Sequence, residues 1–330
     1  MKNNISTPEQ LEELHEFYEE MKDSSYEDVK GVYCVEGAEE GETTAISALT
    51  HGNEFAGLAG LKEIRDQAQI IKGKVLLILH NIDAADLFFE HAQAHQYDLE
   101  AMGDTTEFRS LQGDHDMNRL PSDLLAHYED YQDSSTAQRM KELSPVHTQI
   151  ESILDIHTAH QEAATMSVED HKNILSDRMK VDRAIKNITK HQSGMPAVGF
   201  TRYKMHGSIG FEGGKHPDLK ALENVKQASY AFLEAQGQVE LPADFKRSPS
   251  IPETTTVIDC VKAPNTSFRL TRIYHPGERI TVNELIAENP DNGDQIRAKK
   301  TGDVLFPLKS REVVNPEKGI FFLTEPKNEK

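Results

Sequence analysis

One stretch of the sequence decides the fold class: TTAISALTHGNE, residues 43–54. Its first seven residues are small, β-branched or apolar, which predicts a strand over 43–49. The polar group HGNE follows directly, at the point where that strand would end. Helical spacing of apolar residues then continues over 54–69. The stretch therefore predicts a strand whose carboxyl end leads, through polar residues, into a helix.

Strands and helices alternate on both sides of this stretch. The sequence predicts strands at 31–36, 43–49, 74–79 (KVLLIL), 152–156 and 197–201, and helices at 54–69, 121–127, 135–143, about 169–191 and 218–235. Short apolar strands between helices favour an α/β fold with a mostly parallel central sheet flanked by helices. In such sheets, functional groups gather at the carboxyl ends of the strands.

An amphipathic helix is predicted near the start of the chain. Thr7, Pro8 and Gln10 form a helix-start signature, with threonine as the N-cap and glutamine three residues later. The apolar residues that follow at helical spacing are Leu11, Leu14, Tyr18 and Met21. This pattern favours a helix that packs on the domain with its acidic face in solvent; a partner-binding helix is the alternative.

The pattern changes after Gly237. Four prolines between 242 and 264 interrupt the chain, and residues 254–323 alternate β-branched with polar residues between turn signals. We therefore expect two domains. Residues 1–248 form the α/β domain with the acidic N-terminal helix, and residues 249–330 form a smaller β-rich C-terminal domain.

Composition and charge exclude several classes of protein. The 330 residues contain 36 basic and 55 acidic side chains, a net charge of -19, which argues against binding to nucleic acid or to an anionic membrane. No apolar run approaches the roughly 20 residues that cross a bilayer, and the first residues contain no signal-peptide core. Two cysteines exclude a disulfide framework. We expect a cytoplasmic protein.

The negative charge is unevenly distributed. Residues 1–42 contain 3 basic and 13 acidic side chains, whereas residues 251–330 contain 12 of each. About half of the excess therefore belongs to the N-terminal segment, and the predicted β domain is neutral.

Two motifs supply candidate metal ligands. His51 and Glu54 follow a predicted strand at a spacing of three, and Asp155 and His157 lie at the end of the apolar strand SILDI. Two histidines and a glutamate form a common ligand set of catalytic zinc, with water in the fourth position. A carboxylate two residues before a ligating histidine can orient its ring. Taken alone, Glu54 could instead be an acid that stabilises a helix N-terminus.

Two further segments contain residues suited to catalysis. Asn118-Arg119 places an amide beside a guanidinium, a pair that can hold a carboxylate, although an ordinary polar loop is the alternative. Glu212 lies in GFEGG, where a partly desolvated carboxylate could act as a general base; a tight turn is the alternative.

These motifs resemble those of one family. HGNE, DMNR, DIHT and FEGGKH occur in the order of the succinylglutamate desuccinylase/aspartoacylase family, over about residues 43–237. The resemblance implies a zinc-dependent deacylase with a zinc-carboxypeptidase-like sheet, and the β-rich tail loosely resembles the small C-terminal domain of the family. It also implies that His51, Glu54 and His157 bind one Zn²⁺ per chain, and that Glu212 is the catalytic glutamate.

The same resemblance assigns further residues to the substrate. Asn118 and Arg119 are similar to the pair that binds a substrate carboxylate, and Arg202 lies where some members have a second carboxylate-binding arginine. Arg109 is the candidate for the arginine that polarises the scissile carbonyl, at a spacing one or two residues too long. A second departure follows the strand KVLLIL, where Asn81 precedes Ile82 in place of the family's Asn-Pro.

The resulting hypothesis is hydrolysis of a small anionic N-acyl amino acid by metal-activated water. Two alternatives remain open at this point. The same site could serve a zinc carboxypeptidase that acts on peptides, or the chain could bind metal without turnover.

Overall fold

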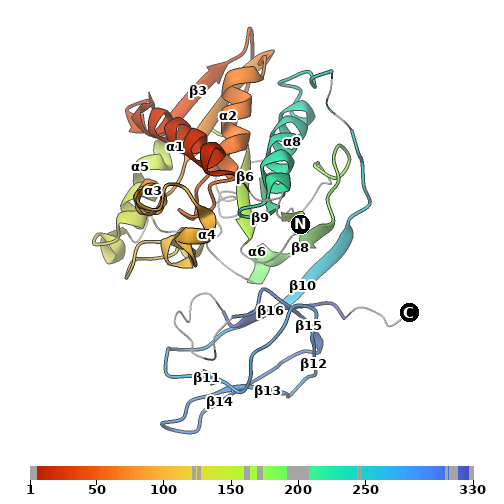
Figure 1. Cartoon of the computed structure of the whole chain (residues 1–330). Helices are drawn as coiled ribbons and strands as arrows, with labels where there is room; N and C mark the ends of the chain where they lie inside the picture. The colour runs from red at the N-terminus through yellow and green to blue at the C-terminus, as the bar shows by residue number, and fades with distance from the viewer. Residues whose placement is uncertain are drawn as a thin grey trace. The chain divides into compact units, whose positions relative to one another are not determined.

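The computed structural model describes residues 6–120, 124, 128–159, 164–168, 174–191, 208–243, 245, 247–308, 311 and 319–326. The chain forms two compact units (Figure 1). The first comprises Met1–Ala184 and Gly194–Glu253, and the second comprises Ile185–Ser193 and Thr254–Lys330. The second unit therefore includes a short segment from the middle of the chain.

The first unit contains the central sheet, in the order β7-β9-β6-β4-β5-β3. Its strands are β3 Val32–Glu36, β4 Glu39–Ala48, β5 Lys72–Leu79, β6 Ser152–Ala159, β7 Met166–Val168 and β9 Ile209–Lys215. Strand β4 pairs in parallel with β5 and β6, and β6 pairs in parallel with β9. Only the flanking pairs β3–β5 and β7–β9 of this order are antiparallel. The predicted α/β fold with a mostly parallel sheet is confirmed.

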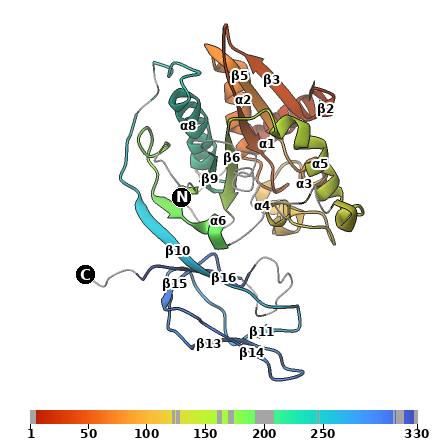
Figure 2. The same ribbon diagram turned by 180° about the vertical axis from the view of Figure 1, so that it is seen from behind.

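Helices cover both faces of this sheet. They are α1 Pro8–Asp23, α2 Gly57–Gln67, α3 Ile82–Ala94, α4 Leu99–Met102, α5 Ser135–His147 and α8 Leu219–Ala235. Figure 1 shows α1, α2 and α8 in front of the sheet, and Figure 2 shows α5 on the opposite side. Short pieces complete the unit: the hairpin β1 Ser25–Tyr26 and β2 Val29–Lys30, and the 3-10 turns η1 Thr106–Arg109, η2 Met117–Arg119 and η4 Tyr128–Tyr131.

The apolar run of β5 explains this layering. Val75, Leu77 and Leu79 belong to the core cluster beneath α1, α2 and α8, whereas Leu76 and Ile78 belong to the cluster beneath α5. All five side chains are fully buried. Strands that are covered on both faces are typically rich in apolar residues at successive positions, and this explains the continuous run VLLIL over residues 75–79.

Helix α1 begins as the sequence predicts. The side chain of Thr7 accepts a hydrogen bond from the Gln10 amide, and the side chain of Gln10 accepts one from the Thr7 amide. The predicted apolar positions Leu11, Leu14, Tyr18 and Met21, together with Phe17, are buried. This burial in the domain core supports the packing interpretation over that of a partner-binding helix.

One predicted helix is wrong, and two observed helices, α3 and α4, were not predicted. The described part of the segment around 169–191 contains turns, the strand β8 Arg183–Lys186 and the short helix α6 Ile188–His191. The amides of Asp182 and Arg183 bond to the Thr165 carbonyl, and these tertiary contacts outweigh helical propensity. The predicted elements at 121–127, apart from Leu124, and at 197–201 lie outside the described residues.

The second unit is β-rich. Its C-terminal part contains two sheets, one in the order β12-β15-β16-β10 and one in the order β11-β13-β14. The strands are β10 Glu253–Val261, β11 Arg269–Leu270, β12 Arg279–Ile280, β13 Leu285–Glu288, β14 Gln295–Arg297, β15 Gly302–Leu305 and β16 Phe321–Thr324. A separate apolar core, which includes Tyr274, Ile286 and Phe321, stabilises this part.

Among the described residues of both units, no helix is both long enough and apolar enough to span a membrane.

The capping box gives a first testable prediction. Thr7→Ala removes the acceptor for the Gln10 amide, which lies 3.3 Å from the threonine hydroxyl. We expect the free energy of unfolding to fall by about 1 kcal/mol, measured by urea denaturation followed by circular dichroism. Thr7→Ser keeps the hydroxyl and should behave as wild type. A Thr7→Ala protein with unchanged stability would contradict a stabilising role for the cap.

Candidate metal centre

The loop after β4 brings two of the candidate residues together. His51 and Glu54 lie in the turn between β4 and α2, where the Glu54 amide donates to the His51 carbonyl at 3.1 Å. Helix α2 begins only at Gly57 and has no acid in its first turn. The alternative interpretation of Glu54, as an acid in the first helical turn, is therefore wrong.

Gly52 allows this loop to lie against α3. A Cβ atom at position 52 would meet the backbone carbonyl of Ala84 at 2.3 Å. Any side chain would force the loop away from α3. The second residue of HGNE is therefore required by close packing.

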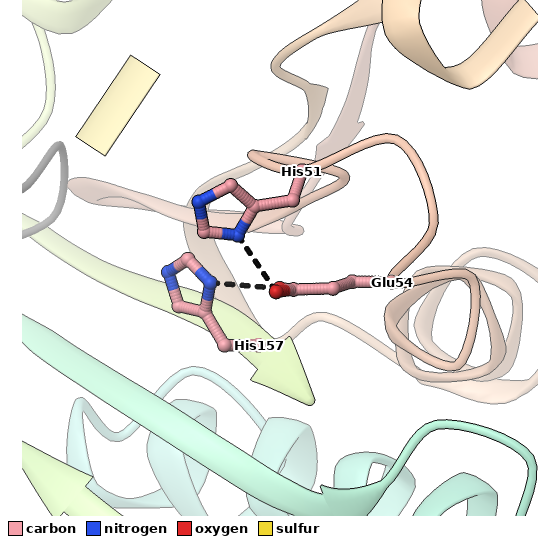
Figure 3. Close-up of side chains that lie close together, drawn as sticks. All are labelled: His51, Glu54 and His157. Atoms are coloured by element: carbon pink, nitrogen blue, oxygen red, sulfur yellow. Dashed lines mark hydrogen bonds and ion pairs between the residues drawn. The ribbon is translucent and has the colours of Figure 1, made fainter. Parts of the chain in front are cut away.

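The carboxylate of Glu54 lies between two imidazole rings. Its Oε1 is 2.7 Å from Nδ1 of His51, and its Oε2 is 2.8 Å from Nδ1 of His157 (Figure 3). One ligand atom from each residue lies within 4.8 Å of the others, and all three side chains are buried. The loop after β4 supplies His51 and Glu54, and β6 supplies His157. The three residues predicted as metal ligands therefore form one cluster.

Each histidine has a second carboxylate behind it. Nε2 of His157 lies 2.8 Å from Oδ2 of Asp155, and Nε2 of His51 lies 3.2 Å from Oδ1 of Asp116. These contacts orient both rings so that each Nε2 faces an acceptor carboxylate and each Nδ1 faces Glu54. The sequence predicted the orienting role of Asp155. It missed Asp116, whose only signal was its place in the same segment as Asn118.

The charges of the cluster shift its pKa values strongly. Burial alone would raise the pKa of Glu54, but His51 and His157 lower it well below its usual range. Burial opposes the charge of His157, yet Asp155 and Glu54 raise the pKa of that imidazole well above its usual range. The cluster therefore stabilises positive charge next to the Glu54 carboxylate.

This arrangement fits a zinc ion. Imidazole nitrogens and a carboxylate oxygen are ordinary zinc ligands, and three protein ligands leave a position for water or substrate. The two Nδ1 atoms face the same carboxylate, and the Nε2 atoms are already occupied by Asp116 and Asp155. Binding of the ion would displace protons, as expected where imidazoles are the ligands.

Glu212 lies on β9, the strand that neighbours the His157 strand β6. Strands β6 and β9 are parallel neighbours, and His157 and Glu212 are register partners. Glu212 is inside β9, so the alternative interpretation of its segment as a tight turn is wrong. Its Oε2 is enclosed and, among the described residues, has no hydrogen-bond partner. Burial raises the pKa of Glu212, although His157 opposes this effect.

Arg109 reaches the same cluster from η1. Its Nη1 is 3.3 Å from Oε1 of Glu54, and its Nε is 3.4 Å from Oδ2 of Asp116. The side chain is 35% exposed, so the guanidinium lies between the buried cluster and the surface. The long spacing noted in the sequence does not keep it from the site.

Of the three predicted substrate-binding residues, the structure describes one side chain, that of Asn118. Asn118 is buried, and its Nδ2 lies 3.2 Å from Nε2 of His51. Arg119 is the last residue of η2, but its side chain is not among the described groups. Arg202 lies outside the described residues. The substrate-binding roles of these three residues stay predictions.

Comparisons with known proteins agree with the sheet and the motifs. Residues 40–203 match the succinylglutamate desuccinylase/aspartoacylase catalytic domain. This match places the chain in the succinylglutamate desuccinylase/aspartoacylase family. The resemblance seen in the sequence is therefore confirmed. The family consists of hydrolytic deacylases that act on amide bonds. No curated protein matches the sequence.

Solved structures share the fold at low sequence identity. A succinylglutamate desuccinylase from Chromobacterium violaceum has 15% identity and a TM-score of 0.56, with 91% of this chain and 89% of that chain covered. A succinylglutamate desuccinylase/aspartoacylase from Rhodobacter sphaeroides has 15% identity and a TM-score of 0.53, with the same coverage. The product-bound ectoine utilization protein EutE (DoeB) from Ruegeria pomeroyi has 14% identity and a TM-score of 0.54, covering 89% and 88%.

The close contact of Gly52 gives a second prediction. Gly52→Ala places a Cβ against the Ala84 backbone, and we expect a loss of about 1–3 kcal/mol from overpacking. Urea unfolding of the metal-free protein measures this loss. Gly210→Ala is the matched control, because among the described residues its Cβ meets only Val168, at an ordinary 3.5 Å. Equal stability of the two variants would show that the 51–54 loop can relax.

Proposed function

We propose that the protein is a zinc-dependent amidohydrolase that removes the acyl group from an N-acyl amino acid. One observation supports this proposal most directly: His51, Glu54 and His157 form a buried cluster in which both Nδ1 atoms face one carboxylate. The membership in a family of hydrolytic deacylases agrees with it.

Zinc at this cluster would supply a Lewis acid that lowers the pKa of a coordinated water. Within the proposal, Asp155 and Asp116 keep the two imidazoles oriented, which fixes the ligand geometry. Glu212 accepts a proton from the attacking water at Oε2 and then donates it to the leaving nitrogen. The raised pKa of Glu212 suits a group that must both accept and return a proton. Arg109 is assigned to stabilise the developing negative charge on the carbonyl oxygen.

We assign the substrate carboxylate to Asn118, Arg119 and Arg202. Their amide and guanidinium groups would hold an anionic amino acid portion so that its amide faces Glu212 and the metal. A small anionic N-acyl amino acid is therefore the proposed substrate class, one Zn²⁺ per chain the proposed cofactor, and the cytoplasm the proposed location.

Metal removal tests the proposal as a whole. The protein is stripped with a chelator, reloaded with zinc, and assayed for release of free amino acid from N-acetyl, N-formyl and N-succinyl amino acids. We expect activity only after reloading, with one zinc bound per chain. Release of C-terminal residues from peptides, without acyl amino acid hydrolysis, would favour a carboxypeptidase. Stoichiometric zinc without any hydrolysis would contradict an enzymatic role.

The assignment of Glu212 gives a separate prediction. Glu212→Gln keeps the size of the side chain but removes the proton acceptor, so we expect kcat to fall by about 10²–10⁴-fold. Zinc stoichiometry should stay at the wild-type value, because Glu212 is not a proposed ligand. Steady-state kinetics with the best substrate of the panel measure the effect. A variant with full activity would remove Glu212 from the role of general base.

A further inference from the structure

A buried polar network lies behind His157, on the side away from Glu54. Asp155 is its centre: Oδ2 faces Nε2 of His157 at 2.8 Å, and Oδ1 accepts hydrogen bonds from Ser47 at 2.8 Å and Thr50 at 3.0 Å. All of these side chains are buried. The orientation of His157 therefore depends on the hydrogen bonds that hold the Asp155 carboxylate in place.

His80 is a further member of this network. It is fully buried directly after β5, and its Nδ1 lies 2.8 Å from Oγ1 of Thr50 and 3.4 Å from Oδ1 of Asp155. Its position was not singled out by any motif of the sequence. Through Asp155 it is linked to the proposed metal ligand His157.

The numbers of hydrogen-bond donors and acceptors on Thr50 and Asp155 indicate which atom of His80 is the donor. A carboxylate is an acceptor only, and a threonine hydroxyl has a single proton to donate. Because Thr50 donates that proton to Asp155, its oxygen must accept the proton of His80 Nδ1. The ring of His80 thereby fixes the direction of the Thr50 hydroxyl, and also offers its own N–H to Asp155.

The backbone of His80 is held from both sides. Its amide donates to the Ala48 carbonyl at 3.0 Å, and its carbonyl accepts a hydrogen bond from Nε of Arg139 at 3.0 Å. Nη2 of Arg139 donates to the Leu79 carbonyl at 2.7 Å. The ring of His147, also from α5, packs edge-on at 5.7 Å from the His80 ring. Helix α5 thus anchors His80 against the end of β4.

We propose that His80 is a positioning residue of the metal centre: it orients Thr50 and Asp155, so that His157 presents Nδ1 to the metal. This role rests on the metal site of the proposed function. His80 makes no contact with substrate or metal in this role, so its effect should appear in zinc affinity and not only in turnover. Outer partners of metal-bound histidines change affinity by about 10–100-fold when they are removed.

The test compares two substitutions of His80. His80→Leu removes the donor, whereas His80→Asn places an amide nitrogen near the position of Nδ1. Zinc dissociation constants are measured by competition with a chromogenic chelator. We expect about a 10–100-fold weaker affinity for His80→Leu, and at least partial recovery of wild-type affinity for His80→Asn.

Thr44→Val is the matched control. Thr44 lies on β4 and, like His80, is fully buried and polar. Its hydroxyl donates to Gln238 at 2.5 Å, in a contact separate from the Asp155 network. Its loss should lower stability but leave zinc affinity unchanged. Equal weakening by Thr44→Val and His80→Leu would mean that zinc affinity reports general loosening of the sheet, and would overturn the proposal.

Thr50→Val supplies an independent arm in case His80→Leu fails to fold. It removes the hydroxyl that links His80 to Asp155, so we expect it to weaken zinc binding as well. Wild-type zinc affinity in a folded His80→Leu or Thr50→Val protein would overturn the positioning role while leaving the proposed function intact. A wild-type protein that binds no zinc would instead overturn both.

Discussion

The contact of one buried carboxylate with two imidazoles is the interaction on which the site depends. Glu54 is 2% exposed, and an unpaired carboxylate at that depth would be strongly destabilising. The Nδ1 atoms of His51 and His157 stabilise it at 2.7 and 2.8 Å. Each imidazole then requires its own acceptor on the far side. The Glu54 carboxylate is therefore surrounded by two imidazoles, and each imidazole contacts a further carboxylate, Asp116 or Asp155.

The parallel sheet makes this arrangement possible. Strands β4 and β6 are neighbours, as are β6 and β9, so their carboxyl ends lie along one edge. His157 and Glu212 come from register partners on β6 and β9, and His51 and Glu54 from the loop after β4. Side chains that are distant in sequence therefore meet at one site, because their backbones already lie side by side in the sheet. The side chains of β6 from Ser152 to Thr158 are all buried, so each polar group on this strand needs a partner from a neighbouring element.

The sequence predicted the inner part of this site because strand ends and ligand chemistry are local properties. His51, Glu54 and His157 could be placed together from two short motifs and the rule that parallel strands end at one edge. Asp116 and His80 were missed because their roles depend on tertiary contacts, the first across 65 residues to His51 and the second through Thr50. The helix predicted around 169–191 was wrong for a related reason. Contacts of Thr165 with Asp182 and Arg183 are not visible in local periodicity.

The departure from the family pattern at Asn81–Ile82 shows how a different residue can satisfy the same local constraint. Asn81 is the N-cap of α3, and its side chain accepts a hydrogen bond from the Ala84 amide at 3.2 Å. Its own amide donates to the Leu49 carbonyl, which joins the start of α3 to the end of β4. The cap therefore holds the first turn of α3 where the Ala84 backbone meets Gly52. A proline at position 82 is not needed to begin the helix, because the asparagine side chain already satisfies an amide of its first turn. The position of His51 and Glu54 thus depends on a helix cap as well as on the sheet.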